Sequence, residues 1–199
     1  SFSSSSEKAE QARISYDTLE KEYPTLFSGY AAPKSVLASR LMSWCNITGI
    51  FVPFTFEANV NVDVPDYSQP ATMCHELSHL RGYMREDEAN FIAYLACRNS
   101  ENVEFQYSGA MLAFVYANNA LYSADSELGQ QVYSSLYEGV QRDFAYNSAY
   151  WKQFEGPVSD IASSVNDTYL KANQQQDGVK SYGRVVDLLL ADYRKNHDK

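Results

Sequence analysis

The most constraining feature of the sequence is the run HELSH at residues 75–79, where two of the chain's three histidines stand four residues apart. Residues at this spacing lie on one face of an α-helix, so His75 and His79 can direct both imidazoles at one point. This arrangement suits tetrahedral Zn²⁺, and Glu76 can then act as a general base toward water at the metal. A catalytic zinc site takes three protein ligands, so the motif requires a third ligand elsewhere.

A helix over this motif is expected on independent grounds. Pro70 suits the first helical position, with Ser68 or Gln69 as the capping residue before it. Gly82 suits the end, because a residue in the left-handed conformation commonly follows the last turn. Burial of the helix is indicated by its apolar residues Met73, Cys74, Leu77 and Leu80. Buried imidazoles and a buried carboxylate need partners, and a metal ion supplies them.

The candidates for the third ligand are Glu86, Asp87 and Glu88, at the start of what is predicted to be the next helix. Glu86 and Asn90 are four residues apart and share a helix face, whereas Glu88 points to roughly the opposite side. The choice between Glu86 and Glu88 stays open at this point.

With these residues the sequence resembles the gluzincin peptidases, in which a second helix bearing E-x-x-A-[DN] follows the HExxH helix. The resemblance implies that Glu86 ligates zinc and that Asn90 orients a ligand histidine through its second ring nitrogen. Two features depart from the family pattern. Asn90 replaces the commoner Asp, and only six residues separate His79 from Glu86. Glu88 therefore remains a rival ligand.

A longer series of segments resembles one bacterial family, domain-of-unknown-function family 3810, whose members are predicted zinc metallopeptidases. These segments are 34–36 (KSV), 49–55 (GIFVPFT), 57–59 (EAN), 75–97, 107–109 (YSG) and 165–173 (VNDTYLKAN). The resemblance implies a zincin fold of the α+β class, mostly helical, with a small sheet and an active-site helix. It also implies a soluble fragment of a membrane-anchored protein, at the extracytoplasmic face of a bacterial membrane, with the anchor preceding Ser1.

The expected function is a zinc-dependent metallopeptidase that hydrolyses peptide bonds in peptide or protein substrates, with Glu76 as general base. A tetrahedral oxyanion also needs a hydrogen-bond donor. Tyr182 and Arg184 are the chosen candidates for this donor, and Tyr169 and Tyr107 are further candidates. The alternative function is a catalytically silent, zinc-bound extracytoplasmic sensor or binding domain.

Composition excludes several classes of partner. A net charge of −9 argues against nucleic acid, which needs clustered Lys and Arg, and against docking on an anionic membrane. No segment approaches the roughly 18–20 apolar residues that span a bilayer, so membrane association is expected only through the N-terminal anchor. The oligomeric state stays open.

Three cysteines are too few for a disulfide framework, although one pair among Cys45, Cys74 and Cys97 could bridge in an oxidising compartment. Cys74 is interpreted as a buried apolar side chain and not as a ligand, because its helical neighbour His75 points about 100° away.

One domain is expected over residues 1–199. Its parts are a flexible lead-in (1–6), N-terminal helices and a small sheet (7–67), metal-site helices (68–98) and a helical C-terminal subdomain (99–199). Helices are predicted at 7–23, 33–44, 89–98, 109–121, 130–146, 149–173 with a break at 156–157, and 182–195.

Alternation of apolar and polar residues from Phe54 to Asp63 predicts a half-buried strand, with 50–52 as its partner or its first half. In zincins the strand before the active-site helix lies at the sheet edge and binds extended peptides. Part of 49–62 is expected either to take that role or to be a plain sheet strand.

Overall fold

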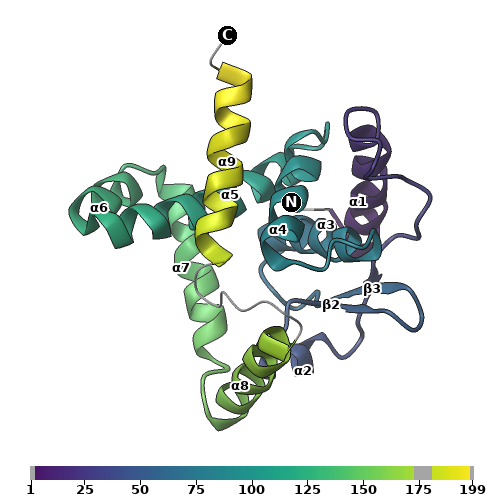
Figure 1. The fold of residues 1–199 in the computed structure, drawn as a ribbon. Helices are drawn as coiled ribbons and strands as arrows, with labels where there is room; N and C mark the ends of the chain where they lie inside the picture. Colours follow the sequence, from purple (N-terminus) through teal and green to yellow (C-terminus); the bar gives the residue numbers. More distant parts are fainter. Residues whose placement is uncertain (1–2, 173–180, 198–199) are drawn as a thin grey trace.

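Two helices, α3 (Gln69–Leu80) and α4 (Glu86–Arg98), pack against each other between α1 and α5 and form the centre of the fold (Figure 1). The computed structural model describes the backbone of residues 3–172 and 181–197, and the side chains of residues 3–164 and 183–197. The described part is mostly helical with one small sheet, which confirms the predicted α+β class.

Helix α1 (Ser5–Leu19) covers one side of α3. It begins earlier than predicted because Ser4 and Glu7 form a capping box, in which each side chain accepts a hydrogen bond from the other's backbone N–H. Residues 5 and 6, expected in the lead-in, therefore belong to this helix, with Ser4 as its cap. The helix also ends earlier than residue 23, because the chain turns there and buries Leu26 in the core.

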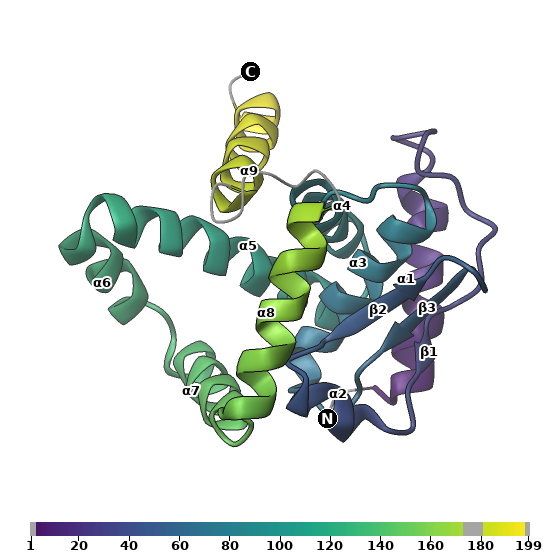
Figure 2. The ribbon, with the colours of Figure 1, turned by 60° about the horizontal axis from the view of Figure 1, so that its bottom comes forward.

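The sheet has the strand order β1-β3-β2, with β1 (Lys34–Ser35) parallel and β2 (Gly49–Val52) antiparallel to β3 (Glu57–Val60). Residues 50–52 are thus the partner of the alternating segment, and β2 is an edge strand. The predicted strand from Phe54 is too long, since residues 53–56 form the turn between β2 and β3. The sheet lies against α3, as Figure 2 shows, and it buries Ala58 and Val60 there.

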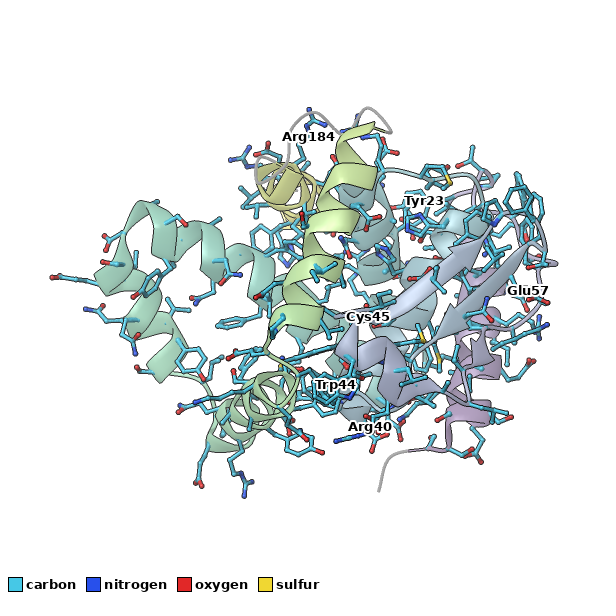
Figure 3. The ribbon with its side chains drawn as sticks, turned by 90° about the horizontal axis from the view of Figure 1, so that it is seen from below. Tyr23, Arg40, Trp44, Cys45, Glu57 and Arg184 are labelled. Carbon is cyan, nitrogen blue, oxygen red and sulfur yellow. The ribbon has the colours of Figure 1, made fainter. Side chains whose placement is uncertain are left out.

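The predicted helix over 33–44 is wrong in its first half. Helix α2 covers only Ser39–Trp44, because Lys34 and Ser35 pair with β3 and the Val36 N–H donates to the carbonyl of Val60. Figure 3 shows Trp44 and Cys45 at the end of α2, and Glu57 at the start of β3.

The C-terminal part consists of helices that lead away from the sheet and return. They are α5 (Val103–Ala124), α6 (Ser126–Ser134), α7 (Glu138–Lys152), α8 (Pro157–Ala172) and α9 (Ser181–His197). α5 packs along α4, α9 packs on both, and α6 and α7 extend away from α1 (Figures 1 and 2). The predicted helix over 130–146 is two helices, while the predicted break at 156–157 is confirmed. No helix in the described ranges has the length and apolar character of a membrane span.

The core joins α1, β3, α3, α4 and the start of α5. Its most buried members include Tyr16, Leu19, Val60, Met73, Cys74, Leu77, Ala93, Cys97 and Phe105. The thiols of Cys74 and Cys97 are free and their sulfurs lie 3.8 Å apart. Gly109 permits the close approach of α5, because a Cβ there would lie 2.6 Å from the Cβ of Cys97. The interpretation of Cys74 as a core residue is confirmed.

Candidate metal centre

A short reversal between α3 and α4 brings the three proposed ligands together. Gly82 ends α3 with φ +87, a left-handed conformation that favours glycine, and its N–H donates to the carbonyl of His79 at 2.9 Å. At the start of α3, Pro70 occupies the second helical position and not the first. Ser68 is the residue before the helix, but its hydroxyl donates to Pro65 and caps no helical N–H.

His75, His79 and Glu86 each offer a ligand atom, and these atoms all lie within 4.8 Å of one another. The Nε2 atom of His75 is 3.1 Å from Glu86 Oε2, and the Nε2 atom of His79 is 3.5 Å from Glu86 Oε1. The imidazole planes are nearly perpendicular, at 89°, with centroids 4.6 Å apart. Two imidazoles and one carboxylate are a donor set that fits a divalent ion such as Zn²⁺.

The second nitrogen of each imidazole is already engaged. The Nδ1–H of His79 donates to the carbonyl of Tyr83 at 2.8 Å, and that of His75 donates to Asn90 Oδ1 at 2.9 Å. A backbone carbonyl can only accept, so the proton of neutral His79 is on Nδ1 and the lone pair on Nε2 faces Glu86. The predicted hydrogen bond between Asn90 and a candidate ligand histidine is present. The role of Tyr83 was missed, because a backbone acceptor leaves no mark on the sequence.

Glu88, the rival ligand, lies outside this cluster. Its side chain is 43% exposed and its carboxylate is 3.7 Å from the Nε atom of Arg85. The structure therefore brings Glu86, and not Glu88, to the two histidines.

Glu76 lies beside the cluster in a buried position, with only 4% of its surface exposed. Burial raises the pKa of Glu76 to about 7, the negative charge of Glu86 adds to the increase, and His75 opposes it. Strand β2 passes directly over this carboxylate, since a Cβ on Gly49 would lie 2.4 Å from Glu76 Oε1. Glycine at position 49 is therefore needed for the edge strand to approach the proposed base.

Burial and mutual contacts shift the pKa values of His75, His79 and Glu86. Burial lowers the pKa of His75, but the hydrogen bond to Glu86 and the charges of Glu76 and Glu86 outweigh it, so this pKa is raised. The pKa of His79 is lowered by burial and then by the charge of His75. Burial raises the pKa of Glu86, but its hydrogen bond to His75 and the two imidazole charges outweigh burial, so the pKa of Glu86 is lowered. A proton on His75 thus competes with any metal for Glu86.

Arg184, one candidate for the oxyanion donor, lies near the start of α9 (Figure 3). Its Nη1 atom is 3.7 Å from the carboxylate of Asp87, the residue after the candidate ligand Glu86, and its side chain is 46% exposed. Asp87 is buried, and its Oδ2 atom also forms an ion pair with Nη2 of Arg85 at 2.7 Å. Arg184 is thus linked to the first turn of α4, one residue from the cluster.

Of the three tyrosines considered as oxyanion donors, the structure describes the side chain of Tyr107 alone. The hydroxyl of Tyr107 donates to Asp143 at 2.5 Å, and its ring packs edge-on against Tyr67. These contacts are with α7 and the segment before α3, and not with His75, His79 or Glu86. The side chains of Tyr169 and Tyr182 lie outside the described residues.

Comparison with known proteins gives one match. No curated protein and no solved structure matches the chain. A family model described as "Protein of unknown function (DUF3810)" matches residues 3–190. Since this match extends over nearly the entire sequence, the chain belongs to the DUF3810 family.

Proposed function

We propose that this protein is a zinc-dependent metallopeptidase in which His75, His79 and Glu86 hold Zn²⁺ and Glu76 is the general base. The observation that carries the proposal is the convergence of two imidazole Nε2 atoms on one carboxylate, with both Nδ1 atoms already engaged by Asn90 and Tyr83. A set of ligands oriented in this way is typical of metal sites, where the outer partners fix the tautomer.

The chemistry of the neighbouring residues supports hydrolysis. When bound, zinc supplies Lewis-acid chemistry that polarises a carbonyl group and lowers the pKa of water. Glu76 lies buried beside the three side chains that would hold the ion, where its carboxylate can take a proton from water and deliver it to the leaving amine. Among the described residues β2 pairs only with β3, so its outer edge, beside Glu76, offers backbone groups to which an extended peptide can add as a further strand.

The expected substrate is therefore a peptide or an extended segment of a protein. The cellular location that goes with this proposal is the extracytoplasmic face of a bacterial membrane, as a soluble fragment of a membrane-anchored protein. That location rests on the family resemblance. Arg184 is proposed to orient the first turn of α4 through Asp87.

The test combines metal content with cleavage of a mixed peptide pool. Wild-type protein is expected to contain about one zinc per chain and to cleave peptides. Glu76→Gln should keep the metal and lose cleavage by a factor of 10² or more, on the order of the usual contribution of a general base. His79→Ala should lose both, and Glu88→Gln, a matched carboxylate change outside the cluster, should keep both.

The outcomes separate the two functions. Bound zinc without any Glu76-dependent cleavage would favour the alternative, a metal-bound sensor or binding domain. Protein that binds no divalent ion would refute both functions together.

A further inference from the structure

Three aromatic rings form a path from the metal cluster to the tip of the β2–β3 hairpin. The ring of Phe51, on β2, lies 6.4 Å from the imidazole of His79. The ring of Phe56, at the end of the hairpin turn, meets Phe51 edge to face at 6.1 Å. Phe51 is half-buried against the main core, whereas Phe56 is 62% exposed. The exposed end of the path is thus an accessible aromatic surface continuous with the proposed site.

The backbone of Phe56 is in an unfavourable conformation. Its φ is +53, a left-handed value that residues with a bulky side chain rarely adopt. An aromatic residue that is both strained and largely exposed contributes little to folding, and glycine would suit the position better. Strain of this kind is concentrated at functional sites, where the direction of the side chain matters more than local stability.

The direction of β2 connects this surface with the bond to be cleaved. Gly49 faces Glu76 and Phe51 faces His79, and since they are two residues apart they share one face of the strand. A peptide that adds to the outer edge of β2 also alternates its side chains between the two faces. One of its side chains, next to the cleaved bond, therefore falls on the face that carries Phe51 and leads toward Phe56.

We propose that Phe51 and Phe56 select substrates with an aromatic or branched aliphatic side chain close to the cleaved bond. Aromatic rings favour such partners, because they gain from burial of apolar area and from edge-to-face contacts. Phe56 supplies the exposed half of the contact and Phe51 its half-buried base. The inference rests on the proposed peptidase function and specifies its substrate class.

The first test compares two peptides that differ at a single position, Phe in one and Ser in the other, chosen from the peptides that wild-type protein cleaves. Wild type is expected to prefer the Phe peptide about tenfold or more in kcat/KM. Phe56→Gly should reduce this preference severalfold. Phe54→Ala is the matched control, because Phe54 lies in the same turn and is 97% exposed, and it should leave the preference unchanged.

Two further measurements do not depend on turnover. The Glu76→Gln protein should bind the Phe peptide more tightly than the Ser peptide, and adding Phe56→Gly should remove the difference. The melting temperature of Phe56→Gly should be equal to or above that of wild type, because glycine relieves the left-handed φ. Equal preference and equal binding in Phe56→Gly and wild type would overturn the inference while Glu76-dependent cleavage still stood. Absence of that cleavage, by contrast, counts against the peptidase itself.

Discussion

At the scale of single residues, ionisation of the buried Glu76 lowers the stability of the folded chain. Its carboxyl group is buried beside Gly49 and the carboxylate of Glu86, so ionisation is costly. The pKa of Glu76 in the folded chain is raised from 4.5 to about 7. A raised pKa means that the folded state holds a proton that the unfolded chain releases. The corresponding stability is fully present below pH 4.5 and is lost as the pH rises through about 7.

Glu76→Gln is therefore expected to stabilise the metal-free protein only at higher pH. Glutamine resembles the neutral carboxyl group, so the variant and wild type should be equally stable near pH 4. Near pH 8 the variant should be more stable by on the order of 3 kcal/mol, the free energy that corresponds to the change in pKa. Urea unfolding with a chelator present measures the difference, and a gain that is the same at both pH values would contradict this account.

Asn90 is expected to tune metal affinity through His75. Asn90→Ala removes the acceptor for the Nδ1–H of His75, so the ring loses its fixed tautomer and orientation. Zinc affinity should fall about 10- to 100-fold, measured by competition with a coloured chelator. Asn90→Asp restores an acceptor and should bind at least as well as wild type. An unchanged affinity in Asn90→Ala would show that the hydrogen bond has no part in the site.

At the scale of elements, the sequence predicted the helices whose signals lie in neighbouring residues. Pro70 and Gly82 marked the two ends of α3, and the apolar run from Ala89 placed α4, although that helix begins at Glu86. These features could be predicted because periodicity and helix ends are properties of neighbouring residues. The segment from Lys34 to Ala38 was missed for the opposite reason. Its pairing with β3 joins residues far apart in the chain, and no signal in the neighbouring sequence predicts that pairing.

The close approach of edge strand β2 to helix α3 is expected to depend on the absence of a side chain at Gly49. A methyl group there would lie 2.4 Å from Glu76 Oε1, so Gly49→Ala must displace either the strand or the carboxylate. The expected result is a loss of about 1–3 kcal/mol in stability and a large loss of cleavage, with zinc still bound. Gly183→Ala, on α9 with no atom within 4 Å of the new Cβ, is the matched control and should lower neither stability nor cleavage, because alanine is the better helix former. Full cleavage by Gly49→Ala would mean that β2 does not confine the base.

At the scale of the whole molecule, the metal cluster lies where the core elements converge. α3 packs on α1, β3, α4 and α5, while α4 packs on α1, α5 and α9. An ion held by His75 and His79 from α3 and Glu86 from α4 would connect the two helices that these elements share. α6 packs on α5 but has no comparable contact with α3 or α4. Metal binding should therefore stabilise the molecule unevenly.

We expect zinc to raise the unfolding free energy and to slow amide exchange chiefly in α3 and α4. Free zinc at 1,000 times its dissociation constant would add about 4 kcal/mol for an ion that binds only the folded state. The gain should shrink as the pH falls, since protonation of His75, whose pKa is raised, competes with the metal for Glu86. Hydrogen exchange with and without a chelator should show new protection in α3 and α4 and little change in α6. In His79→Ala the difference should vanish, because one of the two imidazoles from α3 is gone. Equal protection of α6 and α3 would instead indicate that zinc acts on the fold as a whole and not through this pair of helices.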